Sequence, residues 1–122
     1  MAIKILVVDD EPRFIRLVEA NLKTEGYQVL TAENGLEAVK IVETGEPELV
    51  LLDVMMPVMD GYTAIRHIRK DDQLKHLPII ALTAKALKGD HQKCIQAGAD
   101  DYLSKPVDYD GLIRLAKAWI EK

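Results

Sequence analysis

Leu49-Val50-Leu51-Leu52-Asp53 is the stretch that decides the fold, because four consecutive apolar residues end abruptly at a carboxylate. A short apolar run without polar alternation is typical of a strand that is buried on both faces of a parallel sheet. Residues 3–8 repeat this pattern before two aspartates, and residues 78–82 repeat it before a threonine. Residues 27–32 and 101–104 give weaker strand patterns. The sequence therefore predicts five strands, several of which end in a polar side chain.

Apolar residues at helical spacing separate these strands. They are Phe14, Leu17, Val18 and Leu22; Leu36, Val39, Ile41 and Val42; Tyr62, Ile65 and Ile68; Cys94, Ile95 and Ala97; and Leu112, Ile113, Leu115, Ala116, Trp119 and Ile120. Asn34 is expected to cap the second helix. Gly26 and Gly98 are expected to end the first and fourth helices, and Gly45 to lie just beyond the second.

Five alternations of strand and helix predict an open, doubly wound α/β fold with a parallel sheet and helices on both faces. We expect strand order 2-1-3-4-5; in this order the first and third strands flank the point where the order reverses. We expect residues 1–122 to form a single domain, since a chain of this length suits one domain.

Composition excludes several function classes. The net charge is -4, whereas a protein that binds nucleic acid directly needs clustered Lys and Arg. A single cysteine, Cys94, excludes an internal disulfide and a Cys-rich zinc site, and we expect it to be half-buried on its helix. No apolar run approaches membrane-spanning length and no signal-peptide pattern is present. We therefore expect a cytoplasmic protein that contacts neither membrane nor nucleic acid.

The polar residues that end the strands predict a site. They are Asp9, Asp10, Asp53, Thr83 and Lys105, and a parallel sheet of the expected order gathers them at one edge. Three close carboxylates stay ionised only beside a cation, and oxygen ligands favour Mg²⁺, or Mn²⁺, over zinc. An aspartate in such a site can attack phosphorus and form an acyl phosphate. The metal, the ammonium and the hydroxyl would then balance the phosphoryl oxygens.

The sequence closely resembles the receiver domains of two-component response regulators. The resemblance rests on residues 7–11 (Val-Val-Asp-Asp-Glu), 52–61 (Leu-Asp-Val-Met-Met-Pro-Val-Met-Asp-Gly), 81–84 (Ala-Leu-Thr-Ala) and 102–106 (Tyr-Leu-Ser-Lys-Pro). Each motif alone is weak, but the set occurs in the family's order and spacing across nearly the whole chain. The resemblance implies a flavodoxin-like fold and a signalling function.

The resemblance also implies a role for each residue. Asp53 is expected to be the phosphorylated aspartate, Asp10, Asp53 and the Met55 carbonyl the direct metal ligands, and Asp9 a ligand partly through water. Lys105 is expected to pair with the phosphoryl group, and its bond to Pro106 is expected to be cis. Thr83 and Tyr102 are expected to act as switch residues that move together on phosphorylation.

Two further positions bear on the lifetime of the phosphoryl group. Met55 and Lys85 match positions that flank the attacking water in this family, and neither offers a carboxylate or amide to orient that water. We therefore expect slow self-dephosphorylation.

The expected partners are a histidine kinase or histidine phosphotransfer protein, which supplies the phosphoryl group, and a downstream protein. The chain would catalyse only its own phosphorylation and dephosphorylation. The surface of the fourth helix, fifth strand and fifth helix would bind the downstream partner in a state-dependent way. We expect a monomer or a weak dimer that depends on phosphorylation.

Alternatives remain at this point. Taken singly, Asp9-Asp10 suits an acidic helix start and Asp53 suits a turn. A metal-dependent phosphatase acting on an external substrate shares an Asp nucleophile, but no insertion is present to form a substrate pocket. A flavin or nucleotide carrier shares the architecture, but no Gly-rich loop follows the first strand. Within the signalling reading, a stand-alone regulator is slightly favoured over a receiver cut from a hybrid sensor kinase.

Overall fold

A computed structural model describes residues 2–55, 59–83 and 88–121. Within these residues, five parallel strands form one sheet in the order β2-β1-β3-β4-β5. The strands are β1 Lys4–Val8, β2 Gln28–Ala32, β3 Leu49–Asp53, β4 Ile79–Thr83 and β5 Asp101–Ser104. The predicted doubly wound sheet and its order are therefore confirmed.

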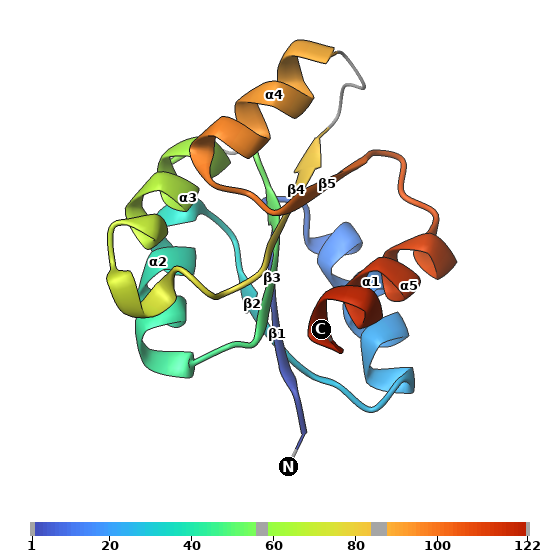
Figure 1. Ribbon diagram of the computed structural model, residues 1–122. Helices are drawn as coiled ribbons and strands as arrows, with labels where there is room; N and C mark the ends of the chain where they lie inside the picture. The colour runs from blue at the N-terminus through green and yellow to red at the C-terminus, as the bar shows by residue number, and fades with distance from the viewer. Residues whose placement is uncertain (1, 56–58, 84–87, 122) are drawn as a thin grey trace.

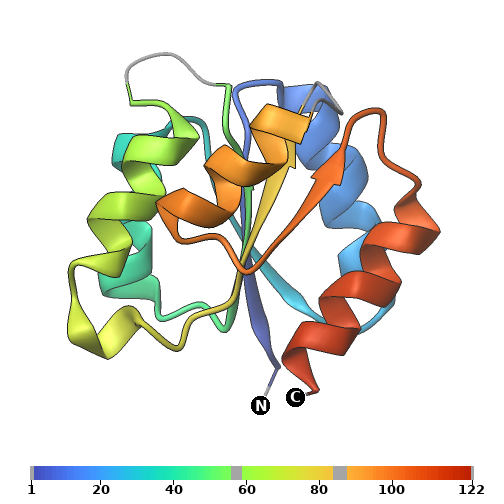
Figure 2. The same ribbon diagram turned by 45° about the horizontal axis from the view of Figure 1, so that its top comes forward.

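Helices cover both faces of this sheet. They are α1 Pro12–Thr24, α2 Gly35–Gly45, α3 Gly61–Arg69, α4 Lys88–Ala97 and α5 Tyr109–Ile120, with a short 3₁₀ turn, η1 Asp72–Leu74, after α3. Helices α1 and α5 lie on one side, and α2, α3 and α4 lie on the other (Figures 1 and 2). In the described part of the chain, no helix combines the length and apolar character needed to cross a membrane.

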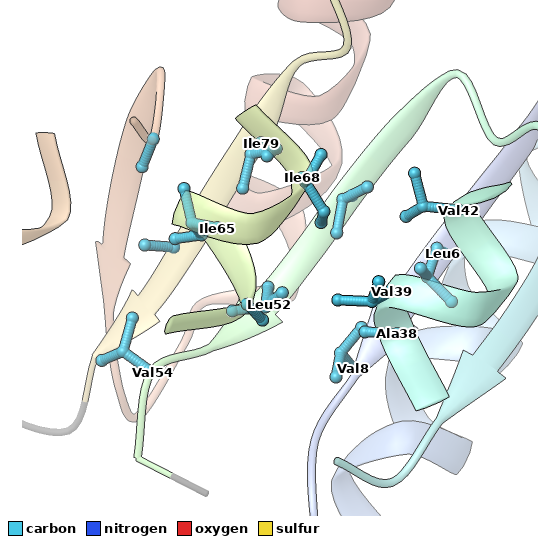
Figure 3. Packing of buried hydrophobic residues seen from close by; sticks show 14 of the residues in the cluster. Leu6, Val8, Ala38, Val39, Val42, Leu52, Val54, Ile65, Ile68 and Ile79 are labelled. Carbon is cyan, nitrogen blue, oxygen red and sulfur yellow. The ribbon is translucent and has the colours of Figure 1, made fainter. Parts of the chain in front are cut away.

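Alternate residues of each central strand enter two separate cores, which explains why the apolar runs are continuous. Leu6, Val8 and Leu52 face α2 and α3, where Ile65 and Ile68 pack against them (Figure 3). The residues between them, including Ile5, Val7, Leu49 and Leu51, pack on the opposite face against α1 and α5. Trp119 of α5 packs against this second core, as the sequence predicted, and its Nε1 donates to Asp101 Oδ2 at 3.1 Å.

The apolar spacing that predicted α1 includes one residue outside its buried face. Leu17 is 44% exposed. The buried residues are Phe14, Ile15, Val18 and Leu22. At about 100° per residue, Ile15 lies roughly 20° beyond Leu22 on the buried side, whereas Leu17 lies roughly 60° away on the other side of Phe14.

Two other helices show the same limitation. Leu36 of α2 and Ile95 of α4 are exposed, although both fit a helical apolar spacing. Cys94 was expected to be half-buried, but it is fully buried beside α3 and β5 residues in the core. Residues adjacent on a helix lie about 100° apart, so spacing alone does not say which neighbour faces the sheet.

The helix ends follow local chemistry. Asn34 caps α2 as predicted, because its side chain accepts a hydrogen bond from the Glu37 amide at 2.9 Å. Gly26 and Gly98 have positive φ at the ends of α1 and α4. The prediction for α2 was wrong by one residue: Gly45 is its last helical residue, and Glu46 adopts the left-handed conformation with φ of 51°.

Arg69, at the end of α3, connects this helix to η1 and to the turn between α4 and β5. Its guanidinium donates to Gly98 O at 2.9 Å, to Leu74 O at 2.8 Å and to Asp100 Oδ2 at 2.8 Å. The same Asp100 oxygen accepts the Ile79 amide at 2.9 Å. Arg69 therefore fixes η1 and the turn into β5 relative to α3, although the sequence analysis did not single it out.

Replacing Arg69 with methionine is expected to lower the free energy of unfolding by about 2–3 kcal/mol. Each of the three acceptors loses its bond from Arg69, whose side chain is only 16% exposed, so water replaces these bonds incompletely. Leu74 O and Asp100 Oδ2 each keep one backbone amide donor. Urea denaturation measures the change. Arg66→Met, at an exposed position on the same helix, is the control and should have little effect; equal losses in both variants would contradict this role.

Candidate functional site

Three carboxylates meet at the carboxyl edge of the sheet. Val8 pairs with Leu52 in the parallel register, so Asp9 follows β1 directly beside Asp53 at the end of β3. Asp9, Asp10 and Asp53 each offer a carboxylate oxygen, and these three oxygens lie within 4.8 Å of one another. Asp9 and Asp53 are buried, whereas Asp10 is exposed. The sequence therefore placed these three residues together correctly.

Backbone amides hold the two buried carboxylates. Asp9 Oδ1 accepts a hydrogen bond from the Glu11 amide at 3.0 Å, at the start of α1. Asp53 Oδ1 accepts one from the Met55 amide at 2.9 Å. Each carboxylate thus has one oxygen fixed by its own loop and a second oxygen directed elsewhere.

Those second oxygens share one ammonium group. Lys105 Nζ lies 2.6 Å from Asp9 Oδ2 and 3.2 Å from Asp53 Oδ2. The Lys105 amide donates to Thr83 O at 2.7 Å, which continues the β4–β5 ladder, and the Lys105-Pro106 peptide bond is cis. The Phe14 ring lies beneath the ammonium, with Nζ 4.4 Å from the ring centroid. Lys105 is therefore held by two anions and one aromatic face.

The pKa of Asp53 is raised above its ordinary value of 3.8. Burial is the main cause, because it disfavours the charged form. The hydrogen bond from the Met55 amide lowers the pKa, the charge of Asp9 raises it, and Lys105 lowers it. The ionised carboxylate is therefore under-compensated, which is the condition that favours binding of a further cation.

The pKa of Lys105 is raised above 10.5 despite burial. Burial acts most strongly and lowers it, but the hydrogen bond to Asp9 and the attraction of Asp53 and Asp9 together outweigh that effect. Lys105 is therefore protonated at neutral pH. Because the folded pKa lies above the unfolded one, the stabilisation is fully present below pH 10.5 and is lost only as the pH rises through the folded pKa.

The donor set fits a hard divalent cation. Three carboxylates supply only oxygen ligands, and one of them is exposed, so a hydrated ion can enter from solvent. His67 and His76 are exposed, and neither belongs to this cluster. The described residues around the site therefore match Mg²⁺ or Mn²⁺ better than zinc.

The two expected switch residues lie on the neighbouring strands. Thr83 is the last residue of β4 and is 2% exposed, one position beyond the Asp53–Leu82 pair. Tyr102 of β5 is half-buried and packs against the core on the α3 and α4 side. Lys85, expected to influence dephosphorylation, lies outside the described residues.

The first residue of α3 lies close to the end of β3. The Gly61 amide donates to Val54 O at 3.1 Å, and a Cβ on Gly61 would lie 2.4 Å from Val54 Cα and 2.5 Å from Asp53 O. Any larger residue at position 61 would therefore displace α3 from the strand end. This contact fixes the backbone immediately after Asp53.

Sequence reasoning missed two contributors to the site. Phe14 was read only as part of an apolar stripe, yet its ring supports the Lys105 ammonium. The Glu11 amide was not singled out, although it fixes Asp9. A cavity of about 470 Å³ lies beside them, lined by Glu11, Phe14, Lys105, Pro106, Val107 and Tyr109. The position of Phe14, two residues after Pro12 in the first turn of α1, was the available signal.

This arrangement defines a class of protein. The family model for the response regulator receiver domain matches residues 5–117, and the chain belongs to that family. Receiver domains are signalling domains of two-component systems rather than classical enzymes, and they work with histidine kinases or phosphotransfer proteins and with downstream targets. Membership in this family favours the signalling reading over the phosphatase and the flavin carrier.

Two response regulators are similar to this chain in sequence. The chain is 43% identical over 108 residues to the response regulator PleD of Caulobacter vibrioides. The matched segment is 88% of this chain but only 24% of PleD. It is 32% identical over 116 residues to the polar-differentiation response regulator DivK of Brucella anthropi, covering 95% of the chain and 94% of DivK. The chain thus spans almost the whole length of DivK but only about a quarter of the length of PleD.

Solved structures agree in fold. The receiver domain of a sensor histidine kinase from Pseudomonas aeruginosa PAO1 has a TM-score of 0.92 and 41% identity, with both chains fully covered. That structure holds a magnesium ion coordinated in its active-site cleft. The chemotaxis protein CheY4 of Vibrio cholerae has a TM-score of 0.91 and 30% identity, over 97% of this chain and 98% of that one.

Proposed function

We propose that this chain accepts a phosphoryl group on Asp53 from the phosphohistidine of a histidine kinase or phosphotransfer protein, with Mg²⁺ as the cofactor. The phosphorylated state then changes the binding of a downstream protein through the α4–β5–α5 surface. The match across residues 5–117 supports one receiver domain spanning residues 1–122. We propose that the protein transforms no external substrate.

The observation that carries this proposal is the shared ammonium of Lys105. It contacts the two buried carboxylates at 2.6 and 3.2 Å, while a third carboxylate stands at the exposed side. One positive charge against three negative charges leaves the site anionic, so it fits a divalent cation and then a phosphoryl dianion. A plain structural ion pair would need neither the third carboxylate nor an open side.

We assign one role to each side chain of the site. A carboxylate oxygen of Asp53 attacks phosphorus; the P–O bond forms as the P–N bond to the donor imidazole breaks, and the imidazole leaves with the electron pair. The side chains of Asp10 and Asp53 and the Met55 carbonyl would hold the metal directly, with Asp9 acting partly through water. When bound, the metal supplies positive charge to the phosphoryl oxygens. Lys105 and the Thr83 hydroxyl would supply the remaining compensation.

The switch is proposed to start at Thr83. Attraction between its hydroxyl and a phosphoryl oxygen draws the end of β4 inward, and Tyr102 on the paired strand follows. Ala81 pairs with Tyr102 and Thr83 with Ser104, so a shift at the end of β4 reaches β5 through the sheet. The two states would differ at the α4–β5–α5 surface, which the downstream partner reads.

The aspartyl phosphate is proposed to be long-lived, because Met55 and Lys85 lack a carboxylate or amide to orient water. Met55 is 64% exposed and lies two residues after Asp53. A thioether is only a weak hydrogen-bond acceptor and holds water poorly.

Incubation with acetyl phosphate and Mg²⁺, followed by intact mass measurement, tests the proposal. We expect one phosphoryl adduct per chain, which is lost when EDTA replaces Mg²⁺ because the carboxylates then repel the incoming anion. Asp60→Asn, which removes a carboxylate at the start of α3 and outside the acidic cluster, should still take up the adduct. An adduct that forms equally well in EDTA would contradict the metal-dependent mechanism.

A further inference from the structure

Three sulfur-bearing residues of the described chain differ widely in exposure. Met55 is 64% exposed, two residues beyond Asp53. Met59 is half-buried and packs against the core, and Cys94 is fully buried. Hydroperoxides oxidise exposed thioethers more readily than covered ones, so among these three the Met55 sulfur is the favoured target.

The backbone of Met55 ties its side chain to the phosphoacceptor. The Met55 amide donates to Asp53 Oδ1 at 2.9 Å, so the Met55 side chain branches from the Cα next to that nitrogen. Its sulfur therefore lies no farther from Asp53 than the length of one methionine side chain allows, on an exposed side chain, and water must arrive at Asp53 to hydrolyse an acyl phosphate. Lys105 occupies the other oxygen, Oδ2, at 3.2 Å.

From this geometry we propose that Met55 is a reversible oxidation site, and that its sulfoxide shortens the lifetime of the phosphoryl group on Asp53; the second part rests on the proposed function. A hydroperoxide is the oxidant. The sulfur lone pair attacks the hydroxyl oxygen of the peroxide, so the S–O bond forms as the O–O bond breaks. The second oxygen leaves with the O–O electron pair and takes up the proton that the attacked oxygen releases, giving water or an alcohol. The sulfur is oxidised by two electrons and the peroxide is reduced by two.

The effect follows from the hydrogen-bonding change at sulfur. The thioether accepts hydrogen bonds weakly, whereas the sulfoxide oxygen is a strong, polar acceptor. An acceptor at this position holds a water molecule beside the phosphoryl group and orients its lone pair toward phosphorus. Methionine sulfoxide reductases restore the thioether, so the lifetime would report the peroxide level and then recover.

The test compares peroxide-treated and untreated protein. Each sample is mapped for sulfoxide by peptide mass spectrometry, phosphorylated with acetyl phosphate and Mg²⁺, desalted, and followed by intact mass as the adduct decays. We expect Met55 to oxidise before Met59, and the half-life to fall on the order of three- to tenfold in the oxidised protein. Met1 and Met56 lie outside the described residues and are mapped separately.

Three variants isolate Met55. In Met55→Leu the half-life should not respond to peroxide, whatever its starting value, whereas Met59→Leu should respond like the unaltered protein. Met55→Gln, which places an amide oxygen at the same position, should shorten the half-life without peroxide. Each variant is compared with and without peroxide, so a variant's own half-life before treatment does not affect the result.

Several results would overturn the inference. They are oxidation of Met59 ahead of Met55, an unchanged or longer half-life in protein oxidised at Met55, and a full peroxide response in Met55→Leu. Each of these leaves the proposed function intact, because the adduct still forms on Asp53. If untreated protein takes up no phosphoryl group, the proposed function fails and the lifetime effect fails with it.

Discussion

Asp53→Asn is expected to abolish the phosphoryl adduct while stabilising the metal-free protein. The adduct is lost because a carboxamide oxygen is not a nucleophile toward phosphorus under these conditions. Stability rises because the substitution removes one of three crowded negative charges at a position that is only 4% exposed. The introduced carboxamide keeps an oxygen for the Met55 amide, and Lys105 keeps its shorter contact with Asp9. The expected gain is on the order of 1–2 kcal/mol at neutral pH.

The pH dependence gives this prediction a definite sign. Burial raises the pKa of Asp53, so the folded protein prefers the neutral carboxyl more strongly than the unfolded chain does. That stabilisation is present below the unfolded value of 3.8 and is lost as the pH rises through the folded pKa. The advantage of Asp53→Asn should therefore be small in acid and full above the folded pKa. Thermal melts across this range, in EDTA, measure it.

Added Mg²⁺ should reverse the order of the two proteins. A bound cation stabilises the native state by mass action, and the wild-type site retains all three carboxylates. Asp53→Asn should gain less from the same Mg²⁺ concentration. A variant that is less stable than wild type in EDTA at neutral pH would contradict the view that the three charges are under-compensated.

Lys105→Met is expected to produce the opposite effect on stability. The substitution leaves Asp9, which is fully buried, without the ammonium that lies 2.6 Å from its carboxylate. Because Lys105 is itself 20% exposed, water relieves part of the loss, and we expect a decrease of about 2–3 kcal/mol. Urea denaturation at neutral pH in EDTA measures it, and Mg²⁺ should restore part of the stability.

The same substitution should slow phosphoryl transfer by on the order of a hundredfold, since a cation that faces the transferred group is lost. Lys23→Met is the matched control, because Lys23 pairs with Glu19 on the exposed side of α1. It should leave both stability and adduct formation nearly unchanged. If Lys105→Met behaves like this control, Lys105 is not the partner of the buried carboxylates in solution.

Most of the fold could be predicted from the sequence, because buried parallel strands have a simple sequence pattern. The apolar runs ending at Asp9, Asp53 and Thr83 are uninterrupted, since each strand is covered on both faces by helices. The polar residues at the strand ends therefore mark the site within the sequence itself. The sheet register then brings residues from different strands to the same edge, which local sequence cannot specify on its own.

Features that depend on packing were predicted less well. Leu17 and Ile15 both suit an apolar helix stripe, and only the orientation of α1 on the sheet decides which of them is buried. The three bonds of Arg69 join segments that lie far apart in the sequence, so no local pattern indicates them. The contact between Phe14 and Lys105 has the same origin. Sequence reasoning therefore identified acidic and basic residues that meet at the sheet edge, but not the residues that hold them in place.

Chemical mapping of the phosphorylated residue tests the central proposal most directly. Borohydride reduces an aspartyl phosphate to homoserine, and peptide mass spectrometry then locates the homoserine. After treatment with acetyl phosphate and Mg²⁺, we predict homoserine at position 53 and none at positions 9 and 10, with no conversion in EDTA. Homoserine at Asp9 or Asp10, or a phosphorylated protein that yields none, would contradict the assignment of Asp53 as the phosphoacceptor.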